Sequence, residues 1–414
     1  MPNSNNANSF YGLNIAPGLL DVISKLGFHT PTPIQQKAIP IAIEGKDVIG
    51  IAQTGTGKTI AFGLPMIQRL AQVKGRGLVL VPTRELAIQV NDTLKMFTPT
   101  FNMLTAVLIG GESMMMQVIA LRKNPRIIVA TPGRLLDHIG QHRIRLDDVS
   151  VLVLDEADRM LDMGFAPQID RILKLIPKDR QTLLFSATMP EKIVSIASTH
   201  MKLPVSTEIA PSGTTVEGIS QEIFVVNSEN KGRLLGKLLE QYTGPILMFT
   251  RTKRGASKAT RIVRAMNHHV AEIHADRSLN QRKEALDGFK SGKYRILIAT
   301  DIAARGIDVK GIELVINYDL PDDPENYIHR IGRTGRAGQM GHAISLATPD
   351  QGQDVHTIEK LIRKTIPLSG HPSVPSEEFS RDARPSSSKS RYGGRSSGHS
   401  RPQSRGSSSR GRWK

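Results

Sequence analysis

The stretch DVIGIAQTGTGKTIAFGLP, residues 47–65, decides the fold of the first half of the chain. It joins an apolar segment to a small-residue loop and then to a helix-forming segment. Gly55 and Gly57 let the backbone turn tightly, so that its N–H groups point inward at phosphate oxygens. Lys58 can then reach the β- and γ-phosphates of a nucleotide, and the Thr59 hydroxyl can bind Mg²⁺. A chance glycine-rich turn is the alternative, but the flanking strand and helix favour a phosphate loop.

The expected nucleotide contacts extend over the whole loop. Its first position holds Ala52, where the strict pattern has glycine, and alanine is small enough for the turn. The loop residues expected to contact nucleotide are Ala52, Gln53, Thr54, Gly55, Thr56, Gly57, Lys58 and Thr59.

A second motif, VSVLVLDEADRML at 149–161, places acids at the end of an apolar strand. Asp155 can hold Mg²⁺, and Glu156 can orient and deprotonate an attacking water. Asp158 would lie nearby for further hydrogen bonds. Taken alone, these acids also fit a solvated helix start, where they favour the positive end of the helix dipole. The apolar run and the Lys58 loop upstream favour catalysis, so the first half is predicted to be a phosphate-loop nucleotidase.

Composition limits the class of protein. The chain has 414 residues, with 55 Lys+Arg against 38 Asp+Glu and no cysteine. Zero cysteine excludes a disulfide framework, a cysteine-ligated zinc site and a cysteine nucleophile, and it fits a cytoplasmic setting. Residues 1–12 lack the basic start and apolar core of a signal peptide, and no apolar run reaches the ~18 residues of a membrane span. The net charge of +17 points to a polyanionic partner, either nucleic acid or anionic lipid.

Short apolar runs alternate with amphipathic stretches over residues 1–370, which predicts parallel α/β sheets. A segment at 204–218, rich in Pro, Gly, Ser and Thr, separates two sets of runs, and we interpret it as an interdomain connection. The expected strands are 47–51, 77–81, 126–130, 149–154 and 181–185 in the first set, and 221–226, 245–249, 270–274, 294–299, 313–317 and 342–347 in the second.

The C-terminal tail differs from the rest. Residues 371–414 hold ten Lys+Arg, three Asp+Glu and fourteen Ser, a net charge of +7. This segment has too few aliphatic residues to bury a core, so we expect it to be disordered. A solubilising tail and a non-specific RNA tether are both consistent with it. The predicted divisions are an N-terminal extension at 1–36, a first domain at 37–208, a linker at 209–218, a second domain at 219–368 and a tail at 369–414.

With these motifs in place, the chain resembles the DEAD-box ATP-dependent RNA helicases, and most of all the bacterial RhlE-type subgroup. The resemblance covers about residues 10–350. The motifs that carry it are GFHTPTPIQ (27–35), AQTGTGKT (52–59), PTRELA (82–87), GG (110–111), TPGR (131–134), DEAD (155–158), SAT (186–188), ATDIAARGID (299–308) and HRIGRTGRAG (329–338).

This resemblance implies two tandem RecA-like domains that bind ATP, with Mg²⁺, and RNA across their cleft. It implies an RNA-dependent ATPase that locally unwinds short RNA duplexes or remodels RNA–protein complexes. An ATP-gated RNA clamp with little unwinding remains an alternative. A DNA translocase would need extra elements for tracking a strand, and the compact core offers none. Ribonucleoprotein or RNA-decay proteins are the expected protein partners, with no membrane involved.

The first motif of the family is expected to recognise adenine. Gln35 can place its amide against adenine N6 and N7, a bidentate geometry that distinguishes A from G. Phe28 or Phe10 is available to stack on the purine, although Phe10 fits a hydrophobic staple equally well. Pro31 and Pro33 would hold Gln35 in an extended approach.

Several strand-end residues are expected to contact RNA. Threonines at helix starts can hydrogen-bond phosphates, although ordinary helix capping uses the same groups. No aromatic residues are interleaved with them, which favours backbone contacts with little sequence specificity. The residues assigned to RNA are Thr83, Arg84, Gly111, Thr131, Arg134 and Thr300.

The HRIGRTGRAG segment supplies the expected contribution of the second half. Arg330 and Arg333 lie three residues apart and Arg336 repeats the step. A half without a phosphate loop could still insert Arg333 and Arg336 towards a γ-phosphate held by the first half, as arginine fingers do. A basic nucleic-acid patch is the alternative. Asp301 is expected to contact the nucleotide ribose or the other domain.

Two further segments are expected at the interface. Ser186 and Thr188 have no His/Asp partners for nucleophilic catalysis, so we expect them to couple Asp158 to the second domain. In IHADRSLNQRKEAL (273–286), Leu279 stands where the family usually has Gln, so no polar role is assigned to it. Arg282 could still make an interdomain or RNA contact.

Overall fold

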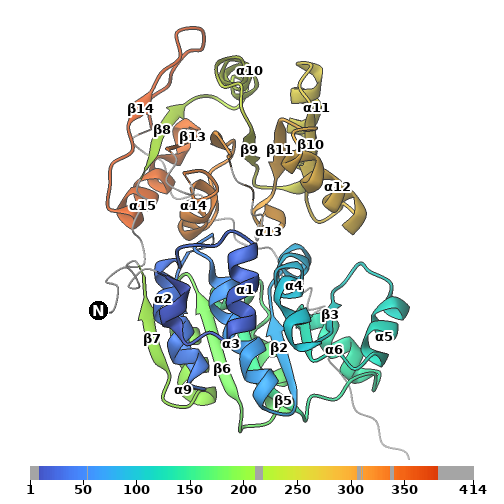
Figure 1. The fold of residues 1–414 in the computed structure, drawn as a ribbon. Helices are drawn as coiled ribbons and strands as arrows, with labels where there is room; N and C mark the ends of the chain where they lie inside the picture. The colour runs from blue at the N-terminus through green and yellow to red at the C-terminus, as the bar shows by residue number, and fades with distance from the viewer. Residues whose placement is uncertain are drawn as a thin grey trace, which may run out of the picture.

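The computed structural model describes residues 9–53, 55–209, 218–304, 309, 311–335 and 340–380. They form two α/β domains, with the first domain in the lower half of Figure 1 and the second in the upper half. Every helix in these ranges is too short or too polar to span a bilayer.

The first domain is built on a seven-stranded sheet with helices on its faces. Its strands are β1 (Val48–Ile51), β2 (Arg76–Leu80), β3 (Thr105–Leu108), β4 (Ile127–Ala130), β5 (Val149–Asp155), β6 (Gln181–Ser186) and β7 (Val205–Glu208). Its helices are α1 (Pro17–Lys25), α2 (Pro33–Ile43), α3 (Lys58–Gln72), α4 (Arg84–Phe97), α5 (Met114–Arg122), α6 (Pro132–Gly140), α7 (Ala157–Asp162), α8 (Ala166–Leu175) and α9 (Glu191–His200), with 3₁₀ turns at Phe10–Leu13 and Thr98–Phe101.

The second domain also has a seven-stranded sheet. Its strands are β8 (Ile219–Val225), β9 (Ile246–Phe249), β10 (Val270–Ile273), β11 (Ile296–Ala299), β12 (Leu314–Asn317), β13 (Gly341–Ala347) and β14 (Leu368–Ser369). Its helices are α10 (Lys231–Gln241), α11 (Lys253–Ala265), α12 (Leu279–Lys290), α13 (Asp301–Ala304), α14 (Pro324–Ile331) and α15 (Gly352–Ile362), with a 3₁₀ turn at Pro349–Gln351.

The two sheets have the same winding. The strand order is β3-β4-β2-β5-β6-β1-β7 in the first and β10-β11-β9-β12-β13-β8-β14 in the second, and every pairing is parallel. Counted from its own first strand, each sheet therefore reads 3-4-2-5-6-1-7. Parallel strands covered on both faces are continuous apolar runs, such as the fully buried ILIA of β11. The prediction of two parallel α/β domains is confirmed.

All the predicted strands are present, and three short strands were not expected. These are β3, β7 and β14, each at or next to a sheet edge. Strand β7 occupies 205–208, so the start of the segment 204–218 belongs to the first sheet and not to a connection. Residues 210–217 of the predicted linker lie outside the described residues.

Two predicted domain boundaries differ from the boundaries that the packing of the chain shows. The N-terminal extension is not separate, because Phe10, Leu19 and Ile23 are buried in the same apolar cluster as the first domain's core. The predicted disordered tail begins too early, because β14 pairs with β8 and Val374 is buried in the second domain. Residues 381–414 of that tail lie outside the described residues.

Candidate functional site

The phosphate loop follows β1 and ends in helix α3. Gly57 is the residue before the helix, with φ of 90°, and a Cβ there would collide with the Gln35 amide. The Lys58 side chain is buried, and its Nζ donates a hydrogen bond to the Ala52 carbonyl at 3.0 Å. The Thr56 hydroxyl donates to the Gln53 carbonyl at 2.7 Å. The loop is thus folded into a tight turn beside a helix N-terminus, the geometry that suits phosphate. Thr54 lies outside the described residues.

Gln35 is placed differently from the expectation. It lies in the first turn of α2, where its Oε1 accepts from the Thr32 N–H at 2.9 Å and its Nε2 donates to the Gly57 carbonyl at 3.1 Å. The predicted extended approach is wrong, because Thr32 and Gln35 form a capping box and Pro33 occupies the first helical position. The amide therefore connects α2 directly to the phosphate loop.

The two candidates for stacking on a purine differ in how exposed their rings are. Phe10 is 4% exposed in the first domain's core, whereas Phe28 is 38% exposed. The core interpretation therefore holds for Phe10, and Phe28 alone offers an accessible ring for a purine.

Asp155 and Glu156 lie at the carboxyl end of β5, both 2% exposed. Glu156 adopts a left-handed backbone, with φ of 52°, and its N–H donates to Asp155 Oδ1 at 3.0 Å. Burial raises the pKa of Asp155 to about 6; Lys58 opposes the rise and Glu156 adds to it. Burial alone would also raise the pKa of Glu156, but Arg159, Lys58 and Arg333 together lower it to about 2. Glu156 is therefore ionised, while Asp155 lacks full compensation of its charge.

Arg159 is a site residue that the sequence analysis missed. Its Nη1 donates to Glu156 Oε2 at 2.9 Å, and the two side chains are 2% and 3% exposed. The sequence carries one signal for it, since an acid and a base three residues apart share a helix face.

Asp158, Ser186 and Thr188 are brought together, but within the first domain. Asp158 Oδ2 accepts from the Thr188 N–H at 2.8 Å and from its hydroxyl at 3.2 Å, and the Asp158 N–H donates to Ser186 Oγ at 3.2 Å. These bonds join the end of β5 to the end of β6. The prediction that they link to the second domain finds no support in them. Across the interface, Asp158 and Asp162 instead face Glu325, a like charge.

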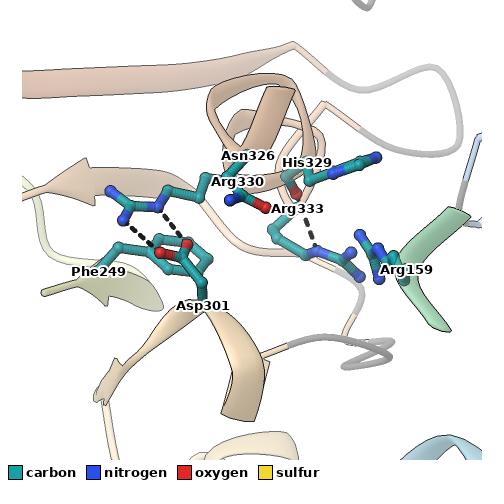
Figure 2. Close-up of a pocket in the computed structure, with 7 residues that line it drawn as sticks. All are labelled: Arg159, Phe249, Asp301, Asn326, His329, Arg330 and Arg333. Atoms are coloured by element: carbon teal, nitrogen blue, oxygen red, sulfur yellow. Dashed lines mark hydrogen bonds and ion pairs between the residues drawn. The ribbon is translucent and has the colours of Figure 1, made fainter. Parts of the chain in front are cut away.

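In the second domain, the buried Arg330 forms an ion pair with the half-buried Asp301. Arg330 Nη2 lies 2.8 Å from Asp301 Oδ2 (Figure 2). The guanidinium carbon of Arg330 lies over the Phe249 ring, 5.1 Å from its centroid. Asp301 is thus held by Arg330, which does not favour the ribose contact. Arg333 Nε donates to the His329 carbonyl at 3.1 Å. Arg336 lies outside the described residues.

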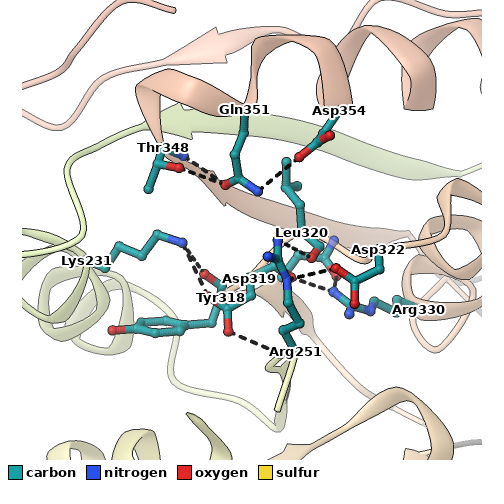
Figure 3. Close-up of polar contacts among 11 residues, drawn as sticks. Lys231, Arg251, Tyr318, Asp319, Leu320, Asp322, Arg330, Thr348, Gln351 and Asp354 are labelled. Carbon is teal, nitrogen blue, oxygen red and sulfur yellow. Dashed lines mark hydrogen bonds and ion pairs between the residues drawn. The ribbon is translucent and has the colours of Figure 1, made fainter. Parts of the chain in front are cut away.

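A polar network holds this part of the second domain in place (Figure 3). Arg330 Nη1 donates to the Asp319 carbonyl at 2.6 Å, and the Arg251 N–H donates to Asp319 Oδ2 at 3.1 Å. The Lys231 ammonium donates to the Tyr318 carbonyl at 2.8 Å. The carboxyl ends of β9 and β12 and the start of α10 are therefore tied together behind Arg330.

The two domains meet at these residues. A pocket of about 200 Å³, counted with the solvent at its open side, is lined by Arg159 of the first domain and, from the second, by Phe249, Asp301, Asn326, His329, Arg330 and Arg333. Arg333 is also close enough to Glu156 to lower the pKa of that carboxyl. The structure thus brings Arg333 to Glu156, directly after β5, as the arginine-finger prediction requires.

A second set of contacts joins the domains further along. Arg282 Nη2 on α12 lies 2.9 Å from Glu85 Oε2 on α4, and both side chains are at most 10% exposed. Leu279, on the same face of α12, is buried in the apolar cluster of the first domain. The expected interdomain contact of Arg282 is confirmed, and Leu279 replaces a polar group with an apolar contact.

Five of the six residues assigned to RNA lie at the same edge of the first sheet, and Thr300 lies in the second domain. Thr83 begins α4, with its Oγ1 accepting from the Leu86 N–H at 3.2 Å, so the capping interpretation holds for it. The Arg84 guanidinium lies against Gly111, where a Cβ would collide with it. The remaining first-domain residues are Thr131, which begins α6, and Arg134, whose Nη1 donates to the Glu112 carbonyl at 3.4 Å. From the second domain, Thr300 follows β11 and is half-buried.

Strand order separates two groups of residues in the first domain. The phosphate loop, Asp155 and Ser186 follow the adjacent strands β1, β5 and β6, in the order β5-β6-β1. Thr83, Gly111 and Thr131 follow the adjacent strands β2, β3 and β4, in the order β3-β4-β2. The residues assigned to nucleotide and those assigned to RNA therefore lie in two adjacent groups at the carboxyl edge of one sheet, where parallel α/β sheets commonly bind ligands.

A magnesium site would rest on oxygen ligands. Among the described residues no group of three or more His, Cys, Asp or Glu side chains gathers as a metal site. Thr59 and Asp155 nevertheless supply the oxygen donors that Mg²⁺ takes alongside phosphates and water, and the raised pKa of Asp155 marks a carboxylate that a cation would stabilise.

Comparisons with known proteins agree with this arrangement. The DEAD/DEAH box helicase family model matches residues 32–196, and the helicase conserved C-terminal domain model matches residues 230–338. The ATP-dependent RNA helicase CshA of Listeria monocytogenes is 45% identical over 83% of this chain and 67% of its own length. The ATP-dependent rRNA helicase RRP3 of Candida albicans is 43% identical over 88% of this chain and 69% of its own length.

Solved structures show the same two-domain fold. Dbp5 of S. cerevisiae, bound to RNA and ADP BeF3, superimposes with a TM-score of 0.79 and 32% identity, over 87% of this chain and 95% of that one. The DEAD-box helicase Mss116, bound to ssRNA and UDP-BeF, gives a TM-score of 0.82 and 27% identity, over 89% and 80% of the two chains. With the motifs, the two domains and these relatives in agreement, the chain belongs to the DEAD-box family of ATP-dependent RNA helicases.

Proposed function

We propose that this chain hydrolyses ATP at the interface of its two domains and uses the cycle to separate short RNA duplexes or to remodel RNA–protein complexes. The observation that carries the proposal is the approach of Arg333 to Glu156 across the interface, where Lys58 also acts on the same carboxyl. One domain supplies the phosphate loop and the acids, and the other supplies the arginine. Activity is therefore expected only when the domains are closed.

The proposed roles follow from the geometry of the side chains. Lys58 and the N-terminus of α3 bind the phosphates, and Glu156, ionised and fixed beside them, accepts a proton from the attacking water. Arg333 stabilises the negative charge that develops on the transferred phosphoryl group. Arg336 is assigned the same role from the sequence alone. Mg²⁺, held by Thr59 and Asp155, would neutralise phosphate charge when bound.

The RNA half of the sheet edge is proposed to hold a single strand by its phosphates. Helix starts at Thr83 and Thr131 present N–H groups, while Arg84 and Arg134 add positive charge. RNA spanning both domains would reach Thr300, so RNA binding and domain closure favour each other. Relatives bound to RNA support this proposal.

Finer assignments rest on the sequence. We propose that the chain belongs to the RhlE-type subgroup, because of the sequence ATDIAARGIDV at 299–309 and the basic tail. A cytoplasmic location is proposed from the absence of cysteine. Ribonucleoprotein or RNA-decay proteins are the proposed partners.

The test uses the full chain with ATP, with and without single-stranded RNA. RNA should stimulate ATP hydrolysis, and Arg333→Ala should abolish most of the stimulation while ATP still binds. Lys58→Ala should weaken binding itself, because it removes the charge that faces the phosphates. Arg261→Ala, an exposed arginine on α11, serves as the control and should behave as wild type. Full stimulation in Arg333→Ala would refute the cross-domain site, and comparison of duplex-unwinding rate with RNA-bound lifetime separates a helicase from a clamp.

A further inference from the structure

Arg159 is a buried charge for which the proposed mechanism has no use. It lies in α7 directly after the DEAD residues and is among the largest fully buried side chains of the described chain. A guanidinium stays charged at any ordinary pH, and burial of a charge is unfavourable unless partners surround it. The partners of Arg159 therefore indicate what the side chain is for.

One half of the guanidinium is bound to the catalytic acid. Arg159 Nη1 donates to Glu156 Oε2 at 2.9 Å, out of contact with water. Glu156 is itself only 2% exposed, so neighbouring atoms surround the carboxylate. This bond fixes the direction in which Glu156 presents its other oxygen.

The other half has no partner. Arg159 Nη2 is buried and makes no hydrogen bond, which is unusual for a buried polar group in a folded protein. Arg159 lines the pocket between the domains, where Figure 2 shows its guanidinium next to that of Arg333. The neighbouring Arg330 differs, because Asp301, Asn317 and the Asp319 carbonyl all accept from it.

Two cations from different domains thus approach each other at the entrance to the nucleotide site, and one of them carries an unused donor. Two neighbouring positive charges repel each other, and an anion bound between them would offset this repulsion. A phosphoryl group matches these donors, because its oxygens accept several charged N–H groups at once and the guanidinium fork suits phosphate. Among the described residues, no carboxylate accepts a hydrogen bond from Arg159 Nη2.

We infer that Arg159 is a second arginine of the phosphate site, whose Nη1 positions Glu156 and whose Nη2 binds an oxygen of the terminal phosphate, opposite Arg333. The same contact would hold inorganic phosphate after hydrolysis. The inference rests on the proposed hydrolysis of ATP at this interface. It assigns to the first domain an arginine that acts in cis, beside the one that acts from the second domain.

The experiment compares Arg159→Gln and Arg159→Lys in the full chain at saturating RNA. It measures kcat, the KM for ATP and inhibition of the ATPase by added inorganic phosphate. Arg159→Gln should lower kcat by about 10²–10³-fold, the scale for loss of one preorganised donor, and should weaken phosphate inhibition. Lysine keeps one point charge for Glu156 but lacks the rigid fork. Arg159→Lys should therefore recover much of kcat while phosphate inhibition stays weak.

Arg145→Gln is the matched control, since this arginine is 83% exposed and pairs only with Asp147 among the described contacts. It should leave all three quantities unchanged. Unaltered phosphate inhibition in Arg159→Gln would overturn the inference even if kcat fell, because support of Glu156 alone would then explain the loss. If the Gln variant does not fold, wild-type phosphate inhibition in Arg159→Lys overturns it equally. A wild-type chain without ATPase activity would instead refute the proposed function.

Discussion

Arg282 of the second domain and Glu85 of the first form an ion pair across the domain interface, with 2.9 Å between Nη2 and Oε2. Glu85 follows Arg84, one of the residues proposed to bind RNA, at the start of α4. Burial lowers the pKa of Arg282, and Glu85 opposes this by raising it. Arg84 is also close enough to Arg282 to lower its pKa further. Arg84, which is proposed to bind RNA, thus lies next to an ion pair between the two domains.

Removal of this pair should weaken domain closure. Glu85→Gln leaves the Arg282 guanidinium buried without its counter-charge, and a hydrogen bond to a charged group contributes about 1.5–3 kcal/mol. The RNA concentration for half-maximal ATPase stimulation should rise at least several-fold. The exchanged variant Glu85→Arg with Arg282→Glu should restore part of the loss. An unchanged RNA requirement in the single variant would show that the pair does not contribute to closure.

Leu279 should support closure by burial of its side chain. Leu279→Gln introduces the residue usual in the family. It removes the free energy gained by burying the leucine side chain, about 1.5–3 kcal/mol. We expect RNA to dissociate faster from the complex formed with a non-hydrolysable ATP analogue. Leu279→Met keeps the volume and apolar character, so it should change the rate little. Slower dissociation in the Gln variant would contradict this account.

Glu156→Gln should retain ATP binding and hydrolyse ATP about 10²–10⁴-fold more slowly, the range for loss of a general base. The Gln side chain can still accept from Arg159, so the fold should persist. RNA should remain bound longer, because hydrolysis reopens the domains. Glu191→Gln, on an exposed helix start, is the comparison for both assays. Near-normal turnover in Glu156→Gln would remove Glu156 from catalysis.

Gln35→Ala should affect stability and nucleotide choice together. It removes hydrogen bonds to Thr32 and Gly57, each worth about 0.5–1.5 kcal/mol, so thermal unfolding of the free protein should occur at a lower temperature. ATP should also lose its advantage over GTP in hydrolysis. Gln36→Ala, the next residue in α2, should leave the ATP preference intact. Equal use of ATP and GTP by the wild type would refute adenine recognition.

Deletion of residues 381–414 should weaken RNA binding without slowing the chemistry. The segment contains all ten cations of the predicted tail and one acid. Because log K for single strands falls with log salt by about 0.7 per neutralised phosphate, the truncated chain should show a flatter salt dependence. Its ATPase rate at saturating RNA should match the full chain. The same salt slope in both proteins would mean that the tail is no RNA tether.

The central strands were predictable because a strand buried on both faces is a continuous apolar run, as in VLVL before Asp155. The edge strand β7 reads VSTE, with one buried residue, so its sequence does not differ from that of a polar connection. The tail boundary was missed for a similar reason. Val374 is buried, Phe379 packs on the core and the Glu377 N–H donates to the Val225 carbonyl, so isolated contacts attach a mostly polar segment to the second domain.

The candidate site was predictable where function follows from position at a strand end, as for Lys58, Asp155 and Glu156. Gln35 was misplaced because adenine recognition was weighed without the capping pattern that Thr32 and Gln35 also form. Arg159 was missed because its one sequence signal, an acid three residues before it, is equally typical of exposed ion pairs on a helix surface.

The shared winding of the two sheets has a consequence for how activity scales with concentration. The two domains have the same topology and face each other across the candidate site, as the subunits of a dimer can. Here, however, they belong to one polypeptide. The connection makes their encounter intramolecular, at an effective concentration set by its length. Specific activity per molecule should therefore stay constant on dilution, whereas the separated halves would lose activity as they were diluted.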